Sequence, residues 1–135
     1  MRLRSLLAIA VAGVVPDATA TACGDGIDSA RRLEGDRYVV VYITVPAPIV
    51  AGEHFAVDFV VCPRAGVAAP DSVRVDATMP EHRHGMNYRP EIVASKNGRY
   101  RADGLLFHMS GRWDLTFDLT TTAGTERLTG TVQLE

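Results

Sequence analysis

Apolar and polar residues alternate over much of the chain. The clearest case is the range 113–119, in which Trp113, Leu115, Phe117 and Leu119 are separated by two aspartates and a threonine. Because successive side chains of a strand point to opposite faces, this pattern predicts a strand with one face in a core and the other in water. Similar alternation, and a β-branched and aromatic run that begins at Tyr38, predict further strands over 38–45, 55–61, 73–79 and 128–134.

Turn sequences separate these runs. Asn97-Gly98 predicts a tight hairpin, because the type I′ turn needs positive φ at both central residues. This hairpin joins an expected strand near 91–95 to one that runs from 99 to about 108. Two later pairs that contain glycine, at 110–111 and 123–124, indicate further reversals of the chain.

The strands and turns together predict the fold class and the domain organisation. Short antiparallel strands with regular turns and no helical periodicity are typical of an all-β, immunoglobulin-like antiparallel β-sandwich, here of about seven strands. We expect this sandwich over 37–135, after a polar lead-in segment over 23–36 that is rich in glycine and aspartate. A chain of 135 residues has room for one such core.

The range 1–22 has the composition of a secretory signal peptide. Two arginines precede an uncharged apolar stretch over 6–15, and Pro16 and small residues follow it. Ala20-Thr21-Ala22 fits the small-residue rule for cleavage. The apolar stretch is too short to anchor the chain across a membrane. We therefore expect an exported protein, periplasmic or secreted, with no transmembrane segment in the mature chain.

Two cysteines, Cys23 and Cys62, remain after such a cleavage. In an oxidising compartment two thiols usually pair, which predicts a disulfide between them. If every turn reverses the chain, Cys62 and the lead-in segment lie at the same end of the sandwich, which favours this pairing. The alternative is that Cys23 becomes the lipidated first residue of a lipoprotein, which would anchor the domain to a membrane surface.

The charge distribution argues against a nucleic-acid partner. Removal of the expected leader takes two arginines and one aspartate from 14 basic and 16 acidic residues, which leaves 12 basic and 15 acidic. The arginines are scattered and Lys96 is the one lysine, whereas nucleic acid needs a concentrated basic face. The sequence also contains no nucleophile elbow, no metalloprotease helix motif and no glycine-rich phosphate loop, so we expect no enzymatic activity.

Reversal at each turn gathers the histidines and the methionines at one end of the sandwich. The strand over 73–79 ends where the strand near 55–61 begins, so the loop over 80–90 lies beside the start of that second strand. The hairpin at 97–98 returns the chain to the same end near residue 108. All four histidines and the three methionines after the initiator lie there, namely His54, His82, His84 and His108 with Met79, Met86 and Met109.

This cluster has the composition of a copper site. Thioether sulfur prefers Cu(I), while imidazole also suits Cu(II) and zinc. His82 and His84 are two residues apart, so they project the same way in an extended backbone. We expect the ligands to be His82, His84, Met86 and His108, with Met109 as an additional thioether. Met79 and Met109 are also in phase with apolar strand faces, which gives packing in the core as their alternative role.

From Met79 onward the sequence resembles the YtkA-like family of exported β-sandwich domains, which are similar in style to the FixH proteins of oxidase assembly. The resemblance covers roughly 55–120 and rests on Met79-Pro80, His84-Gly85-Met86, Gly98-x-Tyr100 and Phe107-x-Met109-x-Gly111-x-Trp113-x-Leu115. It implies copper handling or respiratory-complex assembly, with a respiratory oxidase or a copper-handling protein as partner, and it implies no enzyme. Members of the family often carry methionine where this chain has His82.

The cluster and the resemblance lead to two hypotheses for function. The first is an exported carrier or accessory protein that binds Cu(I) or Cu(II) through the histidine and methionine cluster. The second is a metal-free protein–protein interaction module in respiratory-complex or envelope assembly, in which the same loops contact a partner.

Overall fold

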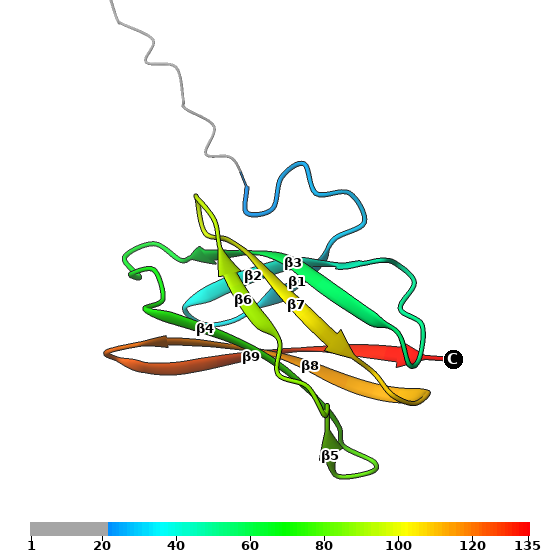
Figure 1. Ribbon diagram of the computed structural model, residues 1–135. Coiled ribbons are helices and arrows are strands. Elements are labelled where there is room, and N and C mark those ends of the chain that lie inside the picture. Colours follow the sequence, from blue (N-terminus) through cyan, green and yellow to red (C-terminus); the bar gives the residue numbers. More distant parts are fainter. Residues whose placement is uncertain (1–21) are drawn as a thin grey trace, which may run out of the picture.

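The computed structural model describes residues 22–135, which form nine strands (Figure 1). The expected signal peptide, apart from Ala22, lies outside the described residues. Within 22–135 no helix has the length and apolar character needed to cross a membrane. The strands are β1 (Arg31–Glu34), β2 (Tyr38–Val45), β3 (His54–Pro63), β4 (Ser72–Met79), β5 (His84–Gly85), β6 (Glu91–Ala94), β7 (Arg99–Leu106), β8 (Gly111–Thr121) and β9 (Gly124–Leu134).

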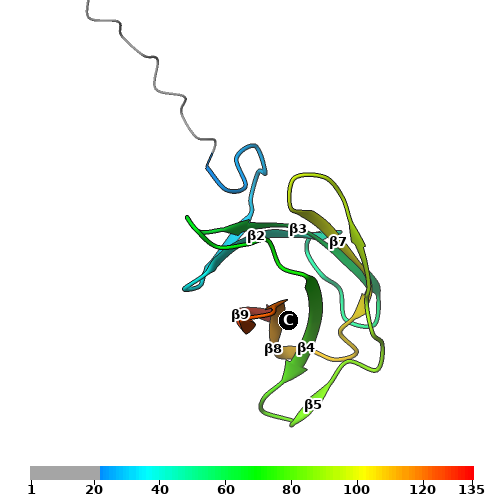
Figure 2. The same cartoon turned by 90° about the vertical axis from the view of Figure 1, so that its left-hand side faces the viewer.

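The strands form two sheets that pack face to face. One sheet has the order β1-β2-β3-β7-β6 and the other has the order β5-β4-β8-β9. All the strand pairs are antiparallel. Figure 2 shows the first sheet curving over the second. The prediction of an all-β antiparallel sandwich is therefore confirmed.

The two strands beyond the expected seven are short and polar. β1 lies within the range that we expected to be an irregular lead-in, and it pairs with β2 from Arg31↔Tyr42 to Glu34↔Val39. β5 consists of two residues in the loop over 80–90 and pairs with the end of β4. Neither strand has an alternating apolar face, so the pattern of the sequence could not reveal it.

The alternating residues of β8 lie at the centre of the core. Trp113, Leu115, Phe117 and Leu119 are all fully buried, which confirms the phase predicted for this strand. Phe117 meets Phe59 of β3 edge to face, with 5.1 Å between ring centroids, and so joins the two sheets. Aromatic pairs of this geometry add about 0.5–1.5 kcal/mol beyond the burial of their area.

β2 is apolar on both faces because both faces are covered. Tyr38, Val40 and Tyr42 belong to the core between the sheets. Val39 and Val41 are also buried, although they point to the other side of the strand. The segment over 22–30 covers that side, and a Cβ atom on Gly24 would lie only 2.6 Å from the side chain of Val41. This double burial explains why 38–45 is an unbroken apolar run instead of an alternating one.

A disulfide joins Cys23 to Cys62, with an S–S distance of 2.01 Å. Cys62 lies opposite Val39 in the pairing of β3 with β2, so the bond ties the segment over 22–30 to the outer face of this sheet. The predicted pairing is confirmed. Because each sulfur is used in the bond, Cys23 has no thiol left for a lipid in this structure.

The carboxylate of Glu126 on β9 closes the turn between β1 and β2. It accepts hydrogen bonds from the backbone N–H groups of Asp36 at 2.7 Å, Arg37 at 3.2 Å and Tyr38 at 3.0 Å. The turn is therefore held to the opposite sheet by one side chain that satisfies three donors.

Substitution of Glu126 by alanine should lower the free energy of unfolding by about 1.5–3 kcal/mol, because hydrogen bonds to a charged acceptor are lost and the three donors lose their partner. Substitution by glutamine should lower it less, since the amide oxygen still accepts. Urea denaturation of the three proteins measures the order. An alanine variant as stable as the wild type would show that water replaces the carboxylate.

Candidate metal-binding site

The loop over 80–90 turns back at once after β4. The backbone N–H groups of His82 and Arg83 both donate to the carbonyl of Met79, at 3.2 and 2.9 Å, and Arg83 has a φ of 55°. This turn brings His84 opposite Met79 and Gly85 opposite Thr78. The sequence therefore places the histidine pair on a short hairpin at the end of β4, and not on an unsupported loop.

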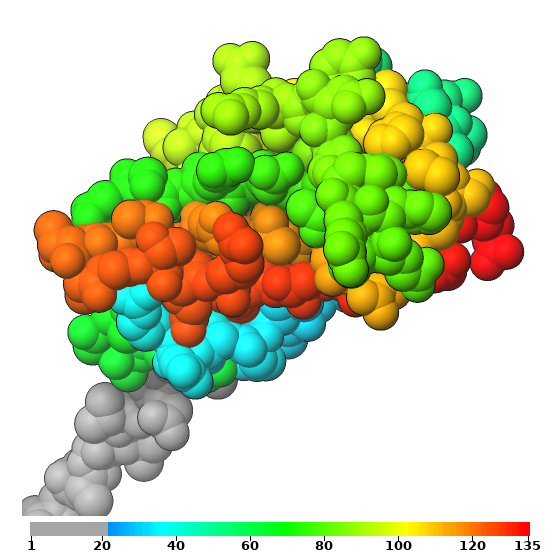
Figure 3. Space-filling view, turned by 90° about the horizontal axis from the view of Figure 1, so that it is seen from below, coloured from blue at the N-terminus to red at the C-terminus, as the bar shows by residue number. Residues whose placement is uncertain are grey.

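Three imidazole rings lie side by side at this end of the sandwich. The ring centroids of His82 and His84 are 5.7 Å apart and the rings are stacked. The ring of His84 lies 4.9 Å from that of His108, which follows β7. In Figure 3 the light green atoms of the loop over 80–90 stand out beside the gold atoms that follow β7. The structure therefore brings the loop histidines next to His108 from two neighbouring segments.

The ring of Trp113 forms the floor beneath two of these imidazoles. Its centroid lies 6.0 Å from that of His84 and 5.4 Å from that of His108, and both contacts are edge to face. The indole is fully buried, stacks on Phe107 at 4.4 Å, and donates from Nε1 to the carbonyl oxygen of Met109 at 3.0 Å. The two histidines therefore rest on a rigid aromatic surface.

The three methionines differ in how deeply they lie. Met79 is fully buried, and its Cε atom would be only 2.7 Å from a Cβ atom at Gly111, so its thioether fills the core beneath the cluster. Met86 and Met109 are partly buried and pack against the core from outside. Packing is therefore the role the structure assigns to Met79, while Met86 and Met109 lie nearer the surface.

His54 lies at the same end but has a different neighbour. Its ring meets that of Tyr88 edge to face at 5.2 Å. Tyr88 is half exposed, and the sequence pattern gave no reason to include it. Trp113 was expected in the core, and its contact with the histidines also went unpredicted. His54 therefore lies outside the cluster formed by His82, His84 and His108.

A model of the YtkA-like family matches residues 34–118 of this chain. The chain belongs to the YtkA-like family. The matched range contains the loop with His82, His84 and Met86 as well as His108, Met109 and Trp113. Comparison with curated proteins and with solved structures gives no match.

The rings of this YtkA-like domain have a spacing that suits a shared metal ion. Since a metal–imidazole bond is about 2.0–2.1 Å long, two rings that bind one ion have centroids no more than about 6 Å apart. The spacings of His84 to His82 and to His108 both satisfy this limit. Nevertheless, among residues 22–135 no group of three or more histidine, cysteine, aspartate or glutamate side chains is arranged to hold a metal ion.

Ligation in the YtkA-like domain therefore requires the rings to rotate. His82 and His108 are exposed, and His84 is half-buried at the edge of the sheet, so no tight core packing surrounds the rings of His82 and His108. Nδ1 of His84 lies 3.4 Å from the carbonyl oxygen of Gly85. A proton on Nδ1 would make that contact and leave Nε2 as the atom that binds a metal. The residues gathered at this end combine imidazole nitrogen with thioether sulfur, a donor type that soft ions prefer.

Proposed function

We propose that this YtkA-like domain is an exported copper-binding carrier or accessory protein. In this proposal His82, His84 and His108 supply nitrogen ligands and Met86 supplies sulfur, with Met109 as an additional thioether. The observation that supports it best is the position of the His84 ring, whose centroid lies 5.7 Å from that of His82 and 4.9 Å from that of His108 on a separate segment.

The choice of copper rests on the mixture of ligands. Zinc sites in proteins are built from thiolate, imidazole and carboxylate, whereas thioether sulfur favours Cu(I). Both cysteines of this chain are held in the disulfide, and so are not available as thiolates. Imidazole nitrogen and thioether sulfur together would accept copper in either oxidation state.

The exposure of the cluster suits a protein that hands its metal on. His82 and His108 are open to solvent, while Trp113 closes the inner side. Ligands of a partner could therefore approach the ion from outside before the first bonds are broken. A respiratory oxidase or another copper-handling protein is the kind of partner that this proposal implies.

A metal-free contact with a partner protein is the second candidate function for the same loops. It is favoured because, among the described residues, no three histidine, cysteine, aspartate or glutamate side chains are arranged to hold a metal ion. It is also favoured by Tyr88, a half-exposed aromatic residue of the kind enriched in protein interfaces.

The His82→Ala, His84→Ala double variant should lose at least about tenfold to a hundredfold in affinity for Cu(I) and Cu(II), equivalent to about 1.4–2.8 kcal/mol. Two ligands are removed from an exposed hairpin, so the fold should remain intact. Competition against a coloured copper chelator measures the affinity. Fluorescence of the one tryptophan, Trp113, reports occupancy independently, since its ring touches two of the ligands.

His54→Ala is the matched control, because this histidine lies at the same end but contacts Tyr88 instead of the cluster. Its copper affinity should equal that of the wild type. Acid should weaken binding as well, since a protonated imidazole cannot bind a metal. If the double variant competes as well as the wild type, the hairpin is not the copper site and the metal-free contact becomes the better account.

A further inference from the structure

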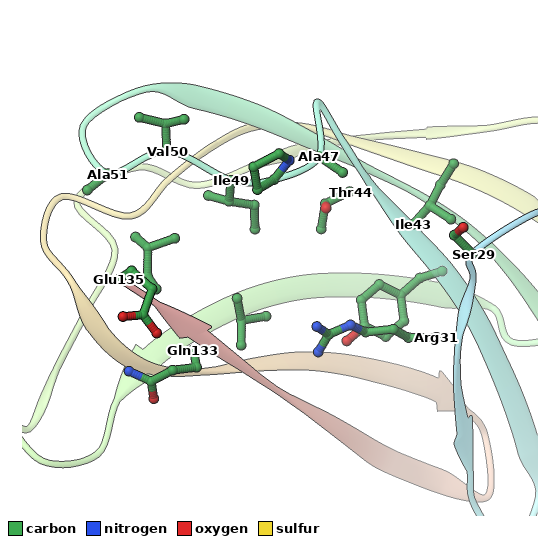
Figure 4. A pocket seen from close by; sticks show the side chains of 14 residues that line it. Ser29, Arg31, Ile43, Thr44, Ala47, Ile49, Val50, Ala51, Gln133 and Glu135 are labelled. Atoms are coloured by element: carbon green, nitrogen blue, oxygen red, sulfur yellow. The ribbon is translucent and has the colours of Figure 1, made fainter.

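A cavity of about 670 Å³ opens on the side of the sandwich, between the segment that links β2 to β3 and the edge strand β9. Figure 4 shows Ile49, Val50 and Ala51 on one wall, Gln133 and Glu135 on the other, and Arg31 at one end. β9 and β5 are the two edge strands of their sheet. The cavity therefore lies at the opposite edge of this sheet from the histidine cluster.

The cavity lies where β1 would continue if it were extended beyond Arg31 along β2. Over Arg31–Glu34, β1 pairs with β2, and Nη1 of Arg31 donates to the carbonyl oxygen of Thr131 on β9 at 2.8 Å. β1 therefore bridges the edges of the two sheets. The chain leaves this line at Ser29, which has a φ of 58°. Beyond Tyr42, β2 has no strand beside it on this edge among the described residues.

Among residues 22–135, the backbone groups of β2 that face this space have no partner in a neighbouring strand. The N–H of Tyr38 donates to Glu126 and its carbonyl accepts from Gly35, so Tyr38 points its backbone groups away from β3. Backbone groups of a strand change side at every residue, and Thr44 therefore points the same way as Tyr38. Thr44 lines the cavity. β1 begins at Arg31, opposite Tyr42, and so does not reach far enough to pair with Thr44.

The backbone of β9 also directs N–H and carbonyl groups toward the cavity, from the opposite wall. The carbonyl of Thr131 points away from β8, because it accepts from Arg31. By the same alternation the N–H and carbonyl groups of Gln133 point away from β8 and toward the cavity that Gln133 lines. Backbone groups in such edges form hydrogen bonds readily with an added strand.

Side chains around the cavity add an apolar lining with charged ends. Val50 lines the cavity and is 48% exposed, one of the large apolar side chains that the described surface leaves open. The hydroxyl of Tyr42, which also lines the cavity, is buried and donates to no acceptor among the described residues. Burial raises the pKa of this hydroxyl, so it remains a donor. Arg31 and Glu135 place opposite charges at the two ends (Figure 4).

We propose that this cavity binds an extended segment of a partner protein as an added strand that prolongs β1. The segment runs antiparallel to β2, as β1 does, pairs with the backbone of Thr44, and directs every second side chain between the sheets. Its carboxyl end lies next to Arg31 and carries an acidic group, while its amino end lies next to Glu135 and carries a basic group. A partner strand is favoured over a small apolar ligand because unpaired backbone groups face the cavity from both walls.

The probe for this proposal is a capped peptide of alternating valine and threonine, with lysine at its amino end and glutamate at its carboxyl end. Fluorescence anisotropy of a labelled copy should show saturable binding. Hydrogen exchange followed by NMR should slow at the N–H groups of Thr44 and Gln133 by about tenfold or more in the complex. The same peptide methylated at alternate amide nitrogens should not bind, because it cannot pair with a strand edge.

Two variants locate the binding. Thr44→Pro removes one backbone donor that faces the cavity and none that bonds to β3, and Ala47→Trp fills the space with a side chain. Each should weaken peptide binding at least about tenfold while the melting temperature and the copper affinity stay near those of the wild type. Val93→Lys, on the open edge strand β6 of the same sheet, should bind the peptide normally.

Three results would overturn the proposal. Equal binding of the methylated peptide would mean that the cavity takes apolar ligands without strand pairing. Loss of binding in Val93→Lys alone would move the added strand to β6. Absence of binding to the wild type at millimolar peptide would mean that the open edge takes no strand. None of these results depends on copper, so the fate of the proposed function is tested separately.

Discussion

Replacement of Trp113 by alanine is expected to lower the free energy of unfolding by about 3–5 kcal/mol. The indole is fully buried, stacks on Phe107 and donates a hydrogen bond to the carbonyl of Met109. Its loss leaves a cavity beneath the histidine cluster and an unpaired carbonyl. Because proteins have only about 5–15 kcal/mol of stability in total, the variant should lose a large share of its stability. Thermal and urea denaturation measure the change.

Trp113→Phe is the matched control. It keeps an aromatic ring in the core and removes the indole N–H, so the loss should be smaller, about 1–2 kcal/mol. The phenylalanine variant should remain folded and should still bind copper through the three imidazoles. An alanine variant that melts within a few degrees of the wild type would show that Trp113 is not packed as described.

Removal of the disulfide is expected to have the second largest effect. The Cys23→Ser, Cys62→Ser variant should lose about 2–4 kcal/mol, because the bond links positions 39 residues apart and restricts the unfolded chain. The segment over 22–30 would also come free of the outer face of β2, where it covers Val39 and Val41. Denaturation of the oxidised, reduced and doubly substituted proteins measures the loss.

The intact mass of the purified protein provides the control for this prediction. A disulfide lowers the mass by two hydrogens relative to the reduced chain, and a lipid on Cys23 would raise it greatly. Copper affinity should be unchanged in the serine variant. Cys62 lies at the end of β3 opposite to His54, and His54 lies at the same end of the sandwich as the histidine cluster. A lipid adduct together with a free thiol at Cys62 would contradict both the bond and the predicted loss of stability.

The sequence predicted most of the fold because burial on one face of a strand leaves a visible alternation. β8 shows this best, since its four apolar positions are all fully buried. The strands that escaped prediction, β1 and β5, are held by backbone pairing with a neighbour and have no apolar face of their own. Each pairs across a turn with the adjacent strand in the sequence, and the apolar pattern of the strand itself does not reveal that pairing.

The candidate site was predicted in position more fully than in geometry. Reversal of the chain at each turn is enough to bring His82, His84 and His108 to one end, and their rings do meet. The direction of each ring depends on side-chain torsions and on the floor that Trp113 provides, which the spacing of residues does not determine. The cavity beside β9 could not be predicted from the sequence, because it opens where β2 continues past Tyr42 without β1 beside it.

We propose that one copper ion binds between the loop over 80–90 and His108. NMR of the histidine ring nitrogens during titration with Cu(I) tests this proposal most directly. At about one equivalent, the ring nitrogens of His82, His84 and His108 should shift together with the thioether methyl of Met86, while those of His54 should stay unchanged. Unchanged ring nitrogens in all three clustered histidines, with the protein folded and copper in excess, would contradict the claim.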